Sequence, residues 1–173
     1  VRNDRVIWAS CMVACGDADG AVTGNTRRFG ASLDKIKQVV KARKGEIMFG
    51  LNLVVYKGKT IFVGDTSVHE YPTSEQMAEM AISASRVVRL FGFDPKVAFV
   101  SHSTFGQPLT SRTKHIKNAV EILKSKNVNF EFDGDMQPDV ALNKEYQNLY
   151  PFSKIVGNAN ILIMPGQHSA AIS

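Results

Sequence analysis

The sequence predicts a single α/β domain, in which helices cover both faces of a largely parallel sheet that also contains one antiparallel hairpin. Two observations predict this class. Short apolar runs typical of strands alternate along the chain with longer segments whose apolar residues recur every three or four positions, the spacing of amphipathic helices. In addition, a length of 173 residues suffices for one substantial core and falls short of two.

The amino-terminal part predicts two helices and a hairpin. Apolar spacing in residues 6–12 indicates a first helix, and residues 33–40 repeat this spacing. Ala21–Thr23, between turn-forming residues, is expected as a short strand. Two β-rich runs within residues 46–66 meet at Lys57-Gly58, which predicts a hairpin.

The remainder alternates helices with strands. Thr73 with Gln76 three residues later fits a capping box, and an apolar stripe continues from there to Phe91 before Gly92 stops the helix. Further helices are expected from Thr110 or Ser111 to Asn127 and at 140–149, and strands at 97–100, 130–132 and 161–164. Strands that alternate with helices in this way favour parallel pairing.

Charge, hydropathy and cysteine content limit the kinds of binding partner and site that the sequence predicts. Lys and Arg number 21 against 16 acidic residues, and the formal net charge is +5, but the basic residues are scattered and not interleaved with aromatics, so no nucleic-acid partner is expected. An anionic small molecule remains open beside a merely solvated basic surface. No apolar run approaches the roughly 20 residues of a membrane span, so no membrane partner is expected. Cys11 and Cys15 are interpreted as reduced, buried thiols of a cytoplasmic protein, without a disulfide framework or a zinc site.

Loops at the carboxyl ends of strands are where ligands of an open α/β sheet bind. Three such loops carry polar groups, at residues 65–67, 101–106 and 133–135. The loop 101–106 combines hydroxyl groups with a glycine, a composition that lets backbone N–H groups and hydroxyls face an anion. It has no Lys or Arg before Arg112, so the balancing charge must come from elsewhere.

Several familiar kinds of site are disfavoured. Ser101, His102 and Ser103 lack the G-x-S-x-G elbow of a serine hydrolase, and neighbouring residues of an extended chain point in opposite directions. No G-x-G-x-x-G sequence is present, and Gly58-Lys59-Thr60 lacks the earlier glycine of a P-loop.

The remaining titratable residues give no firm site. Asp133, Asp135 and Asp139 could hold a divalent cation, but no Glu completes the pattern and a role in turns and helix caps is the stronger interpretation. The other isolated polar candidates are expected to be surface or hydrogen-bonded histidines: His69, His115 and His168.

Five stretches in order resemble the phosphate acetyl/butyryltransferase family: GDADGAVTG, DTSVHEYPTSEQMAEMA, VAFVSHSTFG, FEFDGDMQPDVALN and YPFSKIVGNANILIMPGQHSAAIS. The chain is most similar to the phosphotransacetylase-like C-terminal domain of bacterial NADP-dependent malic enzymes. The resemblance implies a three-layer αβα architecture, one lobe of a two-lobed phosphotransacetylase-like (isocitrate dehydrogenase-like) fold. Residues 1–173 would then be a single lobe of a truncated domain.

The resemblance also implies ligand-binding positions for acetyl-CoA or a related phosphate-bearing effector. These are Thr23, Gly24, Ser101, Ser103, Thr104, Gly106, Asn158 and Asn160. Arg27, Arg112 or a further lobe would supply positive charge. Phe105 stands where transacetylases usually show a lysine, and their D-x-S-R-type motif does not occur in this sequence, so no catalytic residue and no metal ligand is assigned.

The function implied is a regulatory, acetyl-CoA-sensing and oligomerising domain of an NADP-dependent malic enzyme. The parent reaction is oxidative decarboxylation of malate to pyruvate and CO2 with NADP and a divalent metal (Mg or Mn), and none of these cofactors is expected to bind here. The alternative is an active phosphate acyltransferase that moves acetyl between CoA and phosphate. A third possibility is a domain that chiefly makes dimer contacts through its helices or the apolar strand at 161–164.

Overall fold

The computed structural model describes residues 3–106 and 110–172, which fall into two compact units divided after Gly45. The amino-terminal unit contains two helices, α1 (Arg5–Cys15) and α2 (Phe29–Val39). Asp4 caps α1, because its Oδ1 accepts hydrogen bonds from the backbone N–H groups of Val6 and Ile7 at 3.0 and 3.3 Å. Its Oδ2 accepts from Lys35 on α2, and this bond lowers the pKa of Asp4 to about 2.

Two expectations for this unit are wrong. Ala21–Thr23 is exposed loop and not a strand, because no neighbouring strand pairs with it and glycines flank the short apolar run. Cys11 and Cys15 are free thiols as expected, but Cys11 is only half-buried and Cys15 is exposed. The two residues lie one turn apart on α1, which leaves their side chains near the surface of a two-helix unit with little interior.

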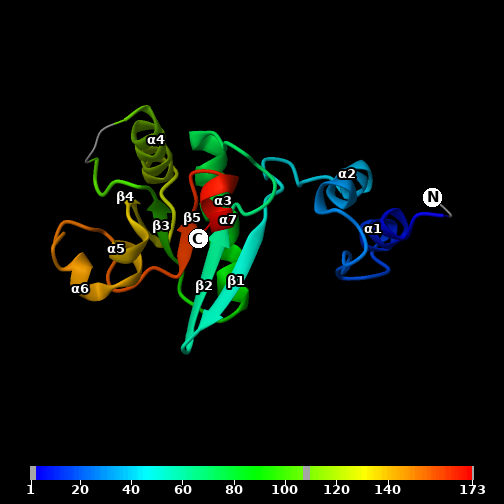
Figure 1. Ribbon diagram of the computed structural model, residues 1–173, viewed down its shortest axis with the longest axis horizontal. Coiled ribbons are helices and arrows are strands. Elements are labelled where there is room, and N and C mark those ends of the chain that lie inside the picture. Colours follow the sequence, from blue (N-terminus) through cyan, green and yellow to red (C-terminus); the bar gives the residue numbers. More distant parts are fainter. Residues whose placement is uncertain (1–2, 107–109, 173) are drawn as a thin grey trace. The chain divides into compact units, whose positions relative to one another are not determined.

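The second unit is built on a five-stranded sheet of order β1-β2-β5-β3-β4 (Figure 1). The pairs β2–β5, β5–β3 and β3–β4 are parallel, and the pair β1–β2 is antiparallel. The strands are β1 (Leu51–Tyr56), β2 (Lys59–Gly64), β3 (Lys96–Val100), β4 (Glu131–Met136) and β5 (Ile161–Ile163). This mixed sheet confirms the predicted fold class.

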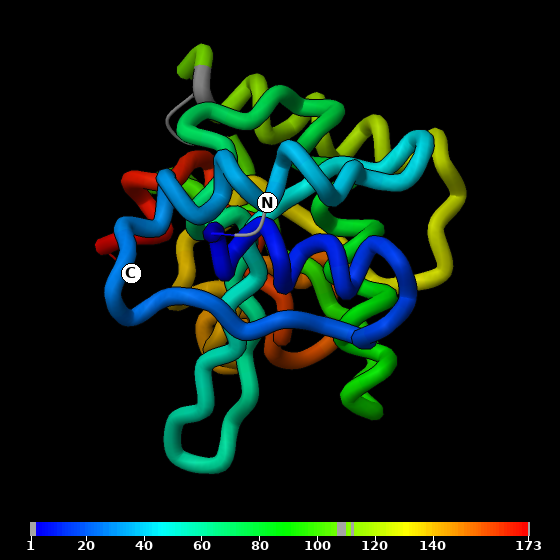
Figure 2. The backbone as a smooth tube through the Cα atoms, turned by 90° about the vertical axis from the view of Figure 1, so that its right-hand side faces the viewer, coloured from blue at the N-terminus to red at the C-terminus, as the bar shows by residue number. Residues whose placement is uncertain are grey.

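The β1–β2 hairpin turns at Lys57 and Gly58, as predicted, and both residues have positive φ angles, 48° and 74°. This is the backbone conformation that two-residue hairpin turns require. The tip of the hairpin projects beyond the rest of the sheet in both views (Figures 1 and 2). β1 is an edge strand whose side chains from Asn52 to Tyr56 are all exposed.

Two hydrophobic cores lie on opposite faces of the sheet. On one face, α3 (Ser74–Leu90) and α4 (Ser111–Ser125) bury Met77, Met80 and Ile116 against Phe62, Phe99, Ile161 and Ile163. On the other face, α5 (Pro138–Leu142) and the segment 150–159 cover Ala98, Met136 and Leu162, and Ala170 of α7 (Gln167–Ile172) packs beside them. Helices therefore cover both faces of the sheet, as expected for three layers.

The last third of the chain departs from the predicted boundaries. β4 extends to Met136, so Asp133 and Asp135 lie in the strand and not in a loop after it. The single helix expected at 140–149 is split into α5 and α6 (Lys144–Gln147), because Asn143 is extended and its side chain caps the second helix at Glu145 N–H. The helix α7 was not expected.

Candidate ligand-binding site at the carboxyl edge of the sheet

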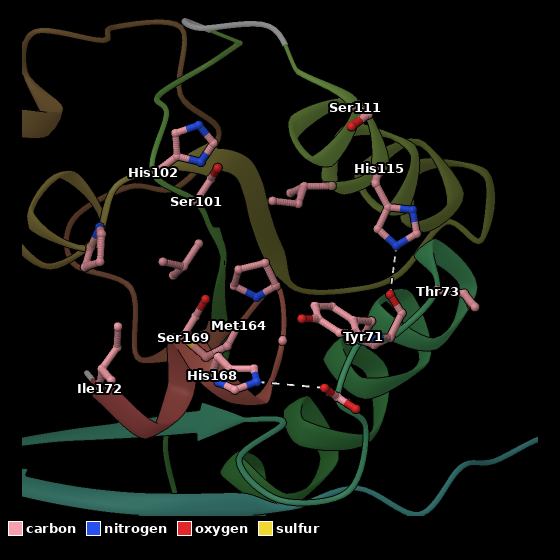
Figure 3. Close-up of a pocket in the computed structure, with 17 residues that line it drawn as sticks. Tyr71, Thr73, Ser101, His102, Ser111, His115, Met164, His168, Ser169 and Ile172 are labelled. Atoms are coloured by element: carbon pink, nitrogen blue, oxygen red, sulfur yellow. Dashed lines mark hydrogen bonds and ion pairs between the residues drawn. The ribbon is translucent and has the colours of Figure 1, made fainter.

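A cavity of about 940 Å³ opens at the carboxyl ends of β3 and β5. These two strands are neighbours, yet the chain leaves β3 toward α4 on one face of the sheet and leaves β5 toward α7 on the other. Such a divergence opens a crevice between the two loops, the usual place for a ligand in this class of fold. Figure 3 shows the wall formed by residues 70–73, 100–102, Ser111, His115, Ile116, Pro138, 164–166, His168, Ser169 and Ile172.

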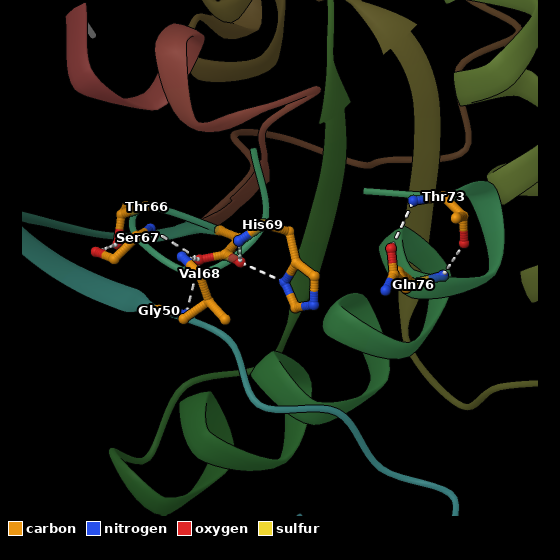
Figure 4. Close-up of polar contacts among 8 residues, drawn as sticks. Gly50, Thr66, Ser67, Val68, His69, Thr73 and Gln76 are labelled. Atoms are coloured by element: carbon orange, nitrogen blue, oxygen red, sulfur yellow. Dashed lines mark hydrogen bonds and ion pairs between the residues drawn. The ribbon is translucent and has the colours of Figure 1, made fainter. Parts of the chain in front are cut away.

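Asp65 holds the segment that leads from β2 into the cavity wall. Its buried carboxylate accepts hydrogen bonds from the backbone N–H groups of Gly50, Ser67, Val68 and His69, at 2.8 to 3.0 Å, and from His69 Nδ1 at 2.7 Å (Figure 4). Burial raises the pKa of Asp65, but the hydrogen bonds from Ser67 and Gly50 and those from His69 and Val68 outweigh burial and lower it. These hydrogen bonds hold residues 65–70, the segment that connects β2 to the cavity wall, in one conformation.

His115 forms the side of the cavity next to α3. Its Nε2 lies 2.8 Å from the carbonyl oxygen of Pro72 and therefore donates, since a carbonyl only accepts. Ser74 Oγ lies 3.0 Å from Nδ1 and donates to the His115 carbonyl oxygen at 2.8 Å. These bonds tie the first turn of α3 to α4 and hold the imidazole ring at the wall (Figure 3).

A close approach of two chain segments closes the floor of the cavity. A Cβ atom at Gly166 would lie 2.6 Å from the carbonyl oxygen of Glu70, so only glycine fits there. The loop after β5 and the loop before α3 can then share one wall. Sequence reasoning missed this contribution of residues 164–166 and of His115. The available signal was Pro165-Gly166 directly after an apolar strand.

The predicted loop 101–106 reaches the cavity through its first residues. Ser101 and His102 line the cavity, whereas Ser103 is 1% exposed and its hydroxyl hydrogen-bonds to Asp135. Thr104 Oγ1 accepts from the backbone N–H of Gln137 at 3.2 Å. Of the loop hydroxyls, only that of Ser101 belongs to a residue of the cavity wall.

Phe105 is uncharged and belongs to an aromatic cluster. Its ring packs against Tyr150 and Phe152, with centroid distances of 5.4 and 4.8 Å. Gly106 has a φ of 87°, and a Cβ atom there would collide with Lys117 Nζ. Lys117 therefore lies against the loop, and it lines a second cavity of about 310 Å³ together with Phe105 and Phe152.

The other predicted ligand-binding positions are Thr23, Gly24, Asn158 and Asn160. Thr23 and Gly24 belong to the amino-terminal unit, where both are exposed. Asn160 precedes β5, where its Oδ1 accepts from Lys96 N–H and its Nδ2 donates to the Asp94 carbonyl oxygen, and Asn158 is exposed nearby. Because β3 and β5 are parallel, both asparagines lie at the opposite edge of the sheet from Ser101. Their part in ligand binding stays a prediction.

The cavity wall carries three histidines and one carboxylate. Among the wall side chains that the structure describes there is no Lys or Arg, and the titratable ones are Glu70, Tyr71, His102, His115 and His168. Arg27, a predicted source of charge, belongs to the other unit and contacts Asp4, and the side chain of Arg112 lies outside the described part of the chain.

The described residues contain no gathered metal ligands. Within 3–106 and 110–172, no three His, Cys, Asp or Glu side chains come together as a metal site. Asp133 instead accepts hydrogen bonds from the backbone N–H groups of Gly134 and Lys154, and Asp139 accepts from Val140 N–H. His69 and His115 are hydrogen-bonded and His168 is exposed, in agreement with their interpretation.

The structure bears on two kinds of partner that the sequence analysis considered, a membrane and a second copy of this chain. None of the helices in residues 3–106 and 110–172 has the length and apolarity needed to cross a membrane. The strand β5 is paired on both edges and fully buried, so it is not available for the dimer contacts considered for residues 161–164.

The fold is that of an α/β domain with a mostly parallel five-stranded sheet, and the cavity lies where the strand order reverses. A family model described as phosphate acetyl/butaryl transferase matches residues 1–173, and the chain belongs to this family. Among curated proteins it is 42% identical to an NADP-dependent malic enzyme of Rhizobium meliloti and 30% identical to a phosphate acetyltransferase of Buchnera aphidicola. The alignments cover 100% and 98% of this chain but 23% and 24% of those proteins. The chain thus spans about a quarter of the length of these relatives.

Solved structures agree with the family. The EutD phosphotransacetylase from Staphylococcus aureus matches with a TM-score of 0.85 at 25% identity, over 96% of this chain and 52% of that one. A phosphotransacetylase from Streptococcus pyogenes matches with a TM-score of 0.87 at 26% identity, over the same shares of the two chains. The predicted resemblance to phosphotransacetylases is therefore confirmed in both sequence and fold.

Proposed function

We propose that this chain is the phosphotransacetylase-like part of an NADP-dependent malic enzyme and that it senses acetyl-CoA as a regulator. The observation that carries the proposal is the loop 101–106. Its Phe105 packs into an aromatic cluster, in the place where the transacetylase pattern has a lysine. The described cavity wall also lacks Lys and Arg side chains. Such a site can hold an acyl-CoA, but it offers little positive charge to stabilise a phosphoryl-bearing transition state.

Three further features support binding. A cavity of about 940 Å³ falls within the range of small-molecule sites. The hydrogen bonds of Asp65 and His115 hold its walls in place. The parent protein would oxidise and decarboxylate malate to pyruvate and CO2, using NADP and Mg²⁺ or Mn²⁺ held by other parts of it. The proposal places it in the cytoplasm as a homo-oligomer, and the exposed apolar side chains of β1 are available for contacts.

A second candidate is an active phosphate acyltransferase. The Buchnera aphidicola relative, named a phosphate acetyltransferase, favours it. Acetyl transfer would require the residues of this chain to be completed by a phosphate-binding cation. Among the described residues, Lys117 is a cation that lies against this loop at Gly106, and it lines the second cavity.

Calorimetric titration of the full-length protein that carries this chain with acetyl-CoA tests the binding role. Ser111 is an exposed wall residue on the first turn of α4, and Ser111→Trp places a large side chain at the cavity mouth. We expect this variant to weaken acetyl-CoA binding at least tenfold. Ser125→Trp, at the exposed other end of the same helix, is the matched control and should leave affinity unchanged. Equal affinity in wild type and Ser111→Trp would remove the cavity from the acetyl-CoA site.

A further inference from the structure

The second cavity, of about 310 Å³, lies between α4 and the edge strand β4. The α4 residues on its wall, at positions 117, 120, 121 and 124, share one face of the helix. β4 contributes residues 133 and 134, and Phe105, Phe152 and Lys154 come from two loops. None of the described residues that line this cavity also lines the first one, so the two spaces have separate walls.

Lysines from two parts of the chain bring positive charge to this cavity. Lys117 and Lys124 belong to α4, and Lys154 lies in the segment before β5. Lys124 forms an ion pair with Glu121, whereas no carboxylate among residues 3–106 and 110–172 pairs with Lys117 or Lys154. Lys117 is half-buried, and its Nζ lies where a Cβ atom at Gly106 would be. The cavity therefore offers two ammonium groups that an anion can contact without displacing an ion pair.

Asp133, the buried acidic residue of this wall, uses both carboxyl oxygens within the protein. Its Oδ1 accepts a hydrogen bond from Gly134 N–H at 2.9 Å, and its Oδ2 accepts from Lys154 N–H at 2.7 Å. The second bond joins β4 to the segment that carries Lys154 and so places this lysine beside the cavity. The described wall holds three lysines and two acidic residues, which favours an anion over a cation.

An aromatic surface forms another part of the wall. The rings of Phe105 and Phe152 pack edge to face, with centroids 4.8 Å apart and an interplanar angle of 68°. Tyr150 packs against both rings. Phe152 still leaves 64% of its surface exposed, so ring surface remains for a ligand. Phe105 has a φ of 51°, which is uncommon for a residue other than glycine, and its N–H donates to the Asp135 carbonyl oxygen at 2.6 Å.

We propose that the cavity between α4 and β4 binds a small organic anion, in which a phosphate or carboxylate group is attached to a flat apolar group. Lys117 and Lys154 contact the anionic group, and the exposed ring of Phe152 contacts the apolar group. A volume of about 310 Å³ lies at the lower end of the range of small-molecule sites and suits a single ring with its acidic group. This site is additional to the one proposed for acetyl-CoA.

Four probes separate the two parts of such a ligand. In the full-length protein, ligand-observed NMR titrations measure the affinities of phenyl phosphate and benzoate, which carry a ring and a charge. Phenol lacks the charge, and inorganic phosphate lacks the ring. We expect phenyl phosphate to bind at least about threefold more tightly than either of these two. Benzoate binding beside it supports the site, and binding of only one of the two aromatic anions supports it and identifies the acidic group.

Two variants with matched controls place the probes in this cavity. Lys117→Met removes one ammonium group and should weaken phenyl phosphate about fivefold. Lys114→Met, at an exposed position of the same helix that is on neither described wall, is the control. Phe152→Leu removes the exposed ring and should weaken phenyl phosphate about threefold while leaving inorganic phosphate unchanged. Its control is Phe91→Leu, an exposed phenylalanine that packs edge-on against another ring.

Several results would overturn the inference. The site is absent if neither aromatic anion binds the wild-type protein, or if phenol or inorganic phosphate binds as tightly as phenyl phosphate. Equal affinities in Lys117→Met and Lys114→Met, or in Phe152→Leu and Phe91→Leu, contradict it as well. Ser111→Trp, which obstructs the first cavity, should leave phenyl phosphate binding unchanged. A loss in that variant would place the anion in the first cavity and would also overturn the inference.

Discussion

Single buried polar side chains organise the carboxyl edge of the sheet. Asp65 collects four backbone N–H groups and one imidazole, and so fixes the segment that leads from β2 to the cavity wall. Asp135, buried inside the sheet, forms a hydrogen bond with the Ser103 hydroxyl and so joins β4 to the loop after β3. For Asp65, a carboxylate that only accepts determines which way the neighbouring donors point.

Replacement of Asp65 tests this role at the scale of one residue. Asp65→Asn keeps the shape of the side chain but loses the charge and part of the acceptor capacity, so we expect the free energy of unfolding to fall by about 2–3 kcal/mol. Denaturant unfolding of wild type and variant measures the difference. The exposed Asp94→Asn is the control, and a loss in Asp65→Asn no larger than in this control would contradict the account.

The pH dependence of stability gives the same residue a second test. The pKa of Asp65 is lower in the folded protein than its ordinary value of 3.8. The stabilisation by its carboxylate is therefore fully present above that ordinary value and is lost as the pH falls through the lowered pKa. As the pH falls through this acidic range, the free energy of unfolding should decline more steeply in wild type than in Asp65→Asn. Parallel curves would show that the charge of Asp65 does not contribute.

At the scale of elements, the sequence predicted those whose signals are local. The capping box at Thr73 and Gln76, the turn at Lys57-Gly58 and the apolar stripe of α3 each need only neighbouring residues, and all three are confirmed. β4 could not be bounded in this way. Aspartates such as Asp133 and Asp135 are unfavourable in strands unless other groups hydrogen-bond to them, and their distant partners, Lys154 N–H and Ser103 Oγ, come close only in the folded chain.

The same distinction applies to the site. The loop at 101–106 was found because it follows a recognisable strand. The hydrogen bond between Ser103 and Asp135 joins residues 32 positions apart, and Gly166 meets Glu70 only after the sheet has formed. Asn158 and Asn160 were grouped with the loop on family resemblance, whereas the parallel pairing of β3 and β5 places them at the other edge.

The start of α3 offers a prediction for an element. Thr73 Oγ1 accepts from Gln76 N–H at 3.2 Å, and Gln76 Oε1 accepts from Thr73 N–H at 2.8 Å (Figure 4). Thr73→Ala removes one half of this capping box and should lower the free energy of unfolding by about 1 kcal/mol. The midpoint of chemical denaturation measures it. Ser125→Ala at the end of α4 serves for comparison, and an equal midpoint in both variants would argue against a stabilising cap.

At the scale of the whole molecule, the sheet topology and the site belong together. The reversal of strand order at β3 and β5 creates the crevice, and helices from opposite faces supply its walls. The chain covers about a quarter of the malic enzyme relatives, so regulation in a longer protein would require binding here to alter chemistry elsewhere. A ligand can do this only by binding two states of that protein with different affinity.

The central claim, that acetyl-CoA bound in this cavity regulates malate oxidation, is tested most directly by one kinetic measurement. The rate of NADPH formation from malate by the full-length protein is recorded against acetyl-CoA concentration, for wild type, Ser111→Trp and Ser125→Trp. The account predicts that acetyl-CoA changes the rate of wild type and Ser125→Trp, and that Ser111→Trp keeps its basal rate but no longer responds. The same response in all three proteins, or no response in wild type together with formation of acetyl phosphate from acetyl-CoA and phosphate, would contradict it.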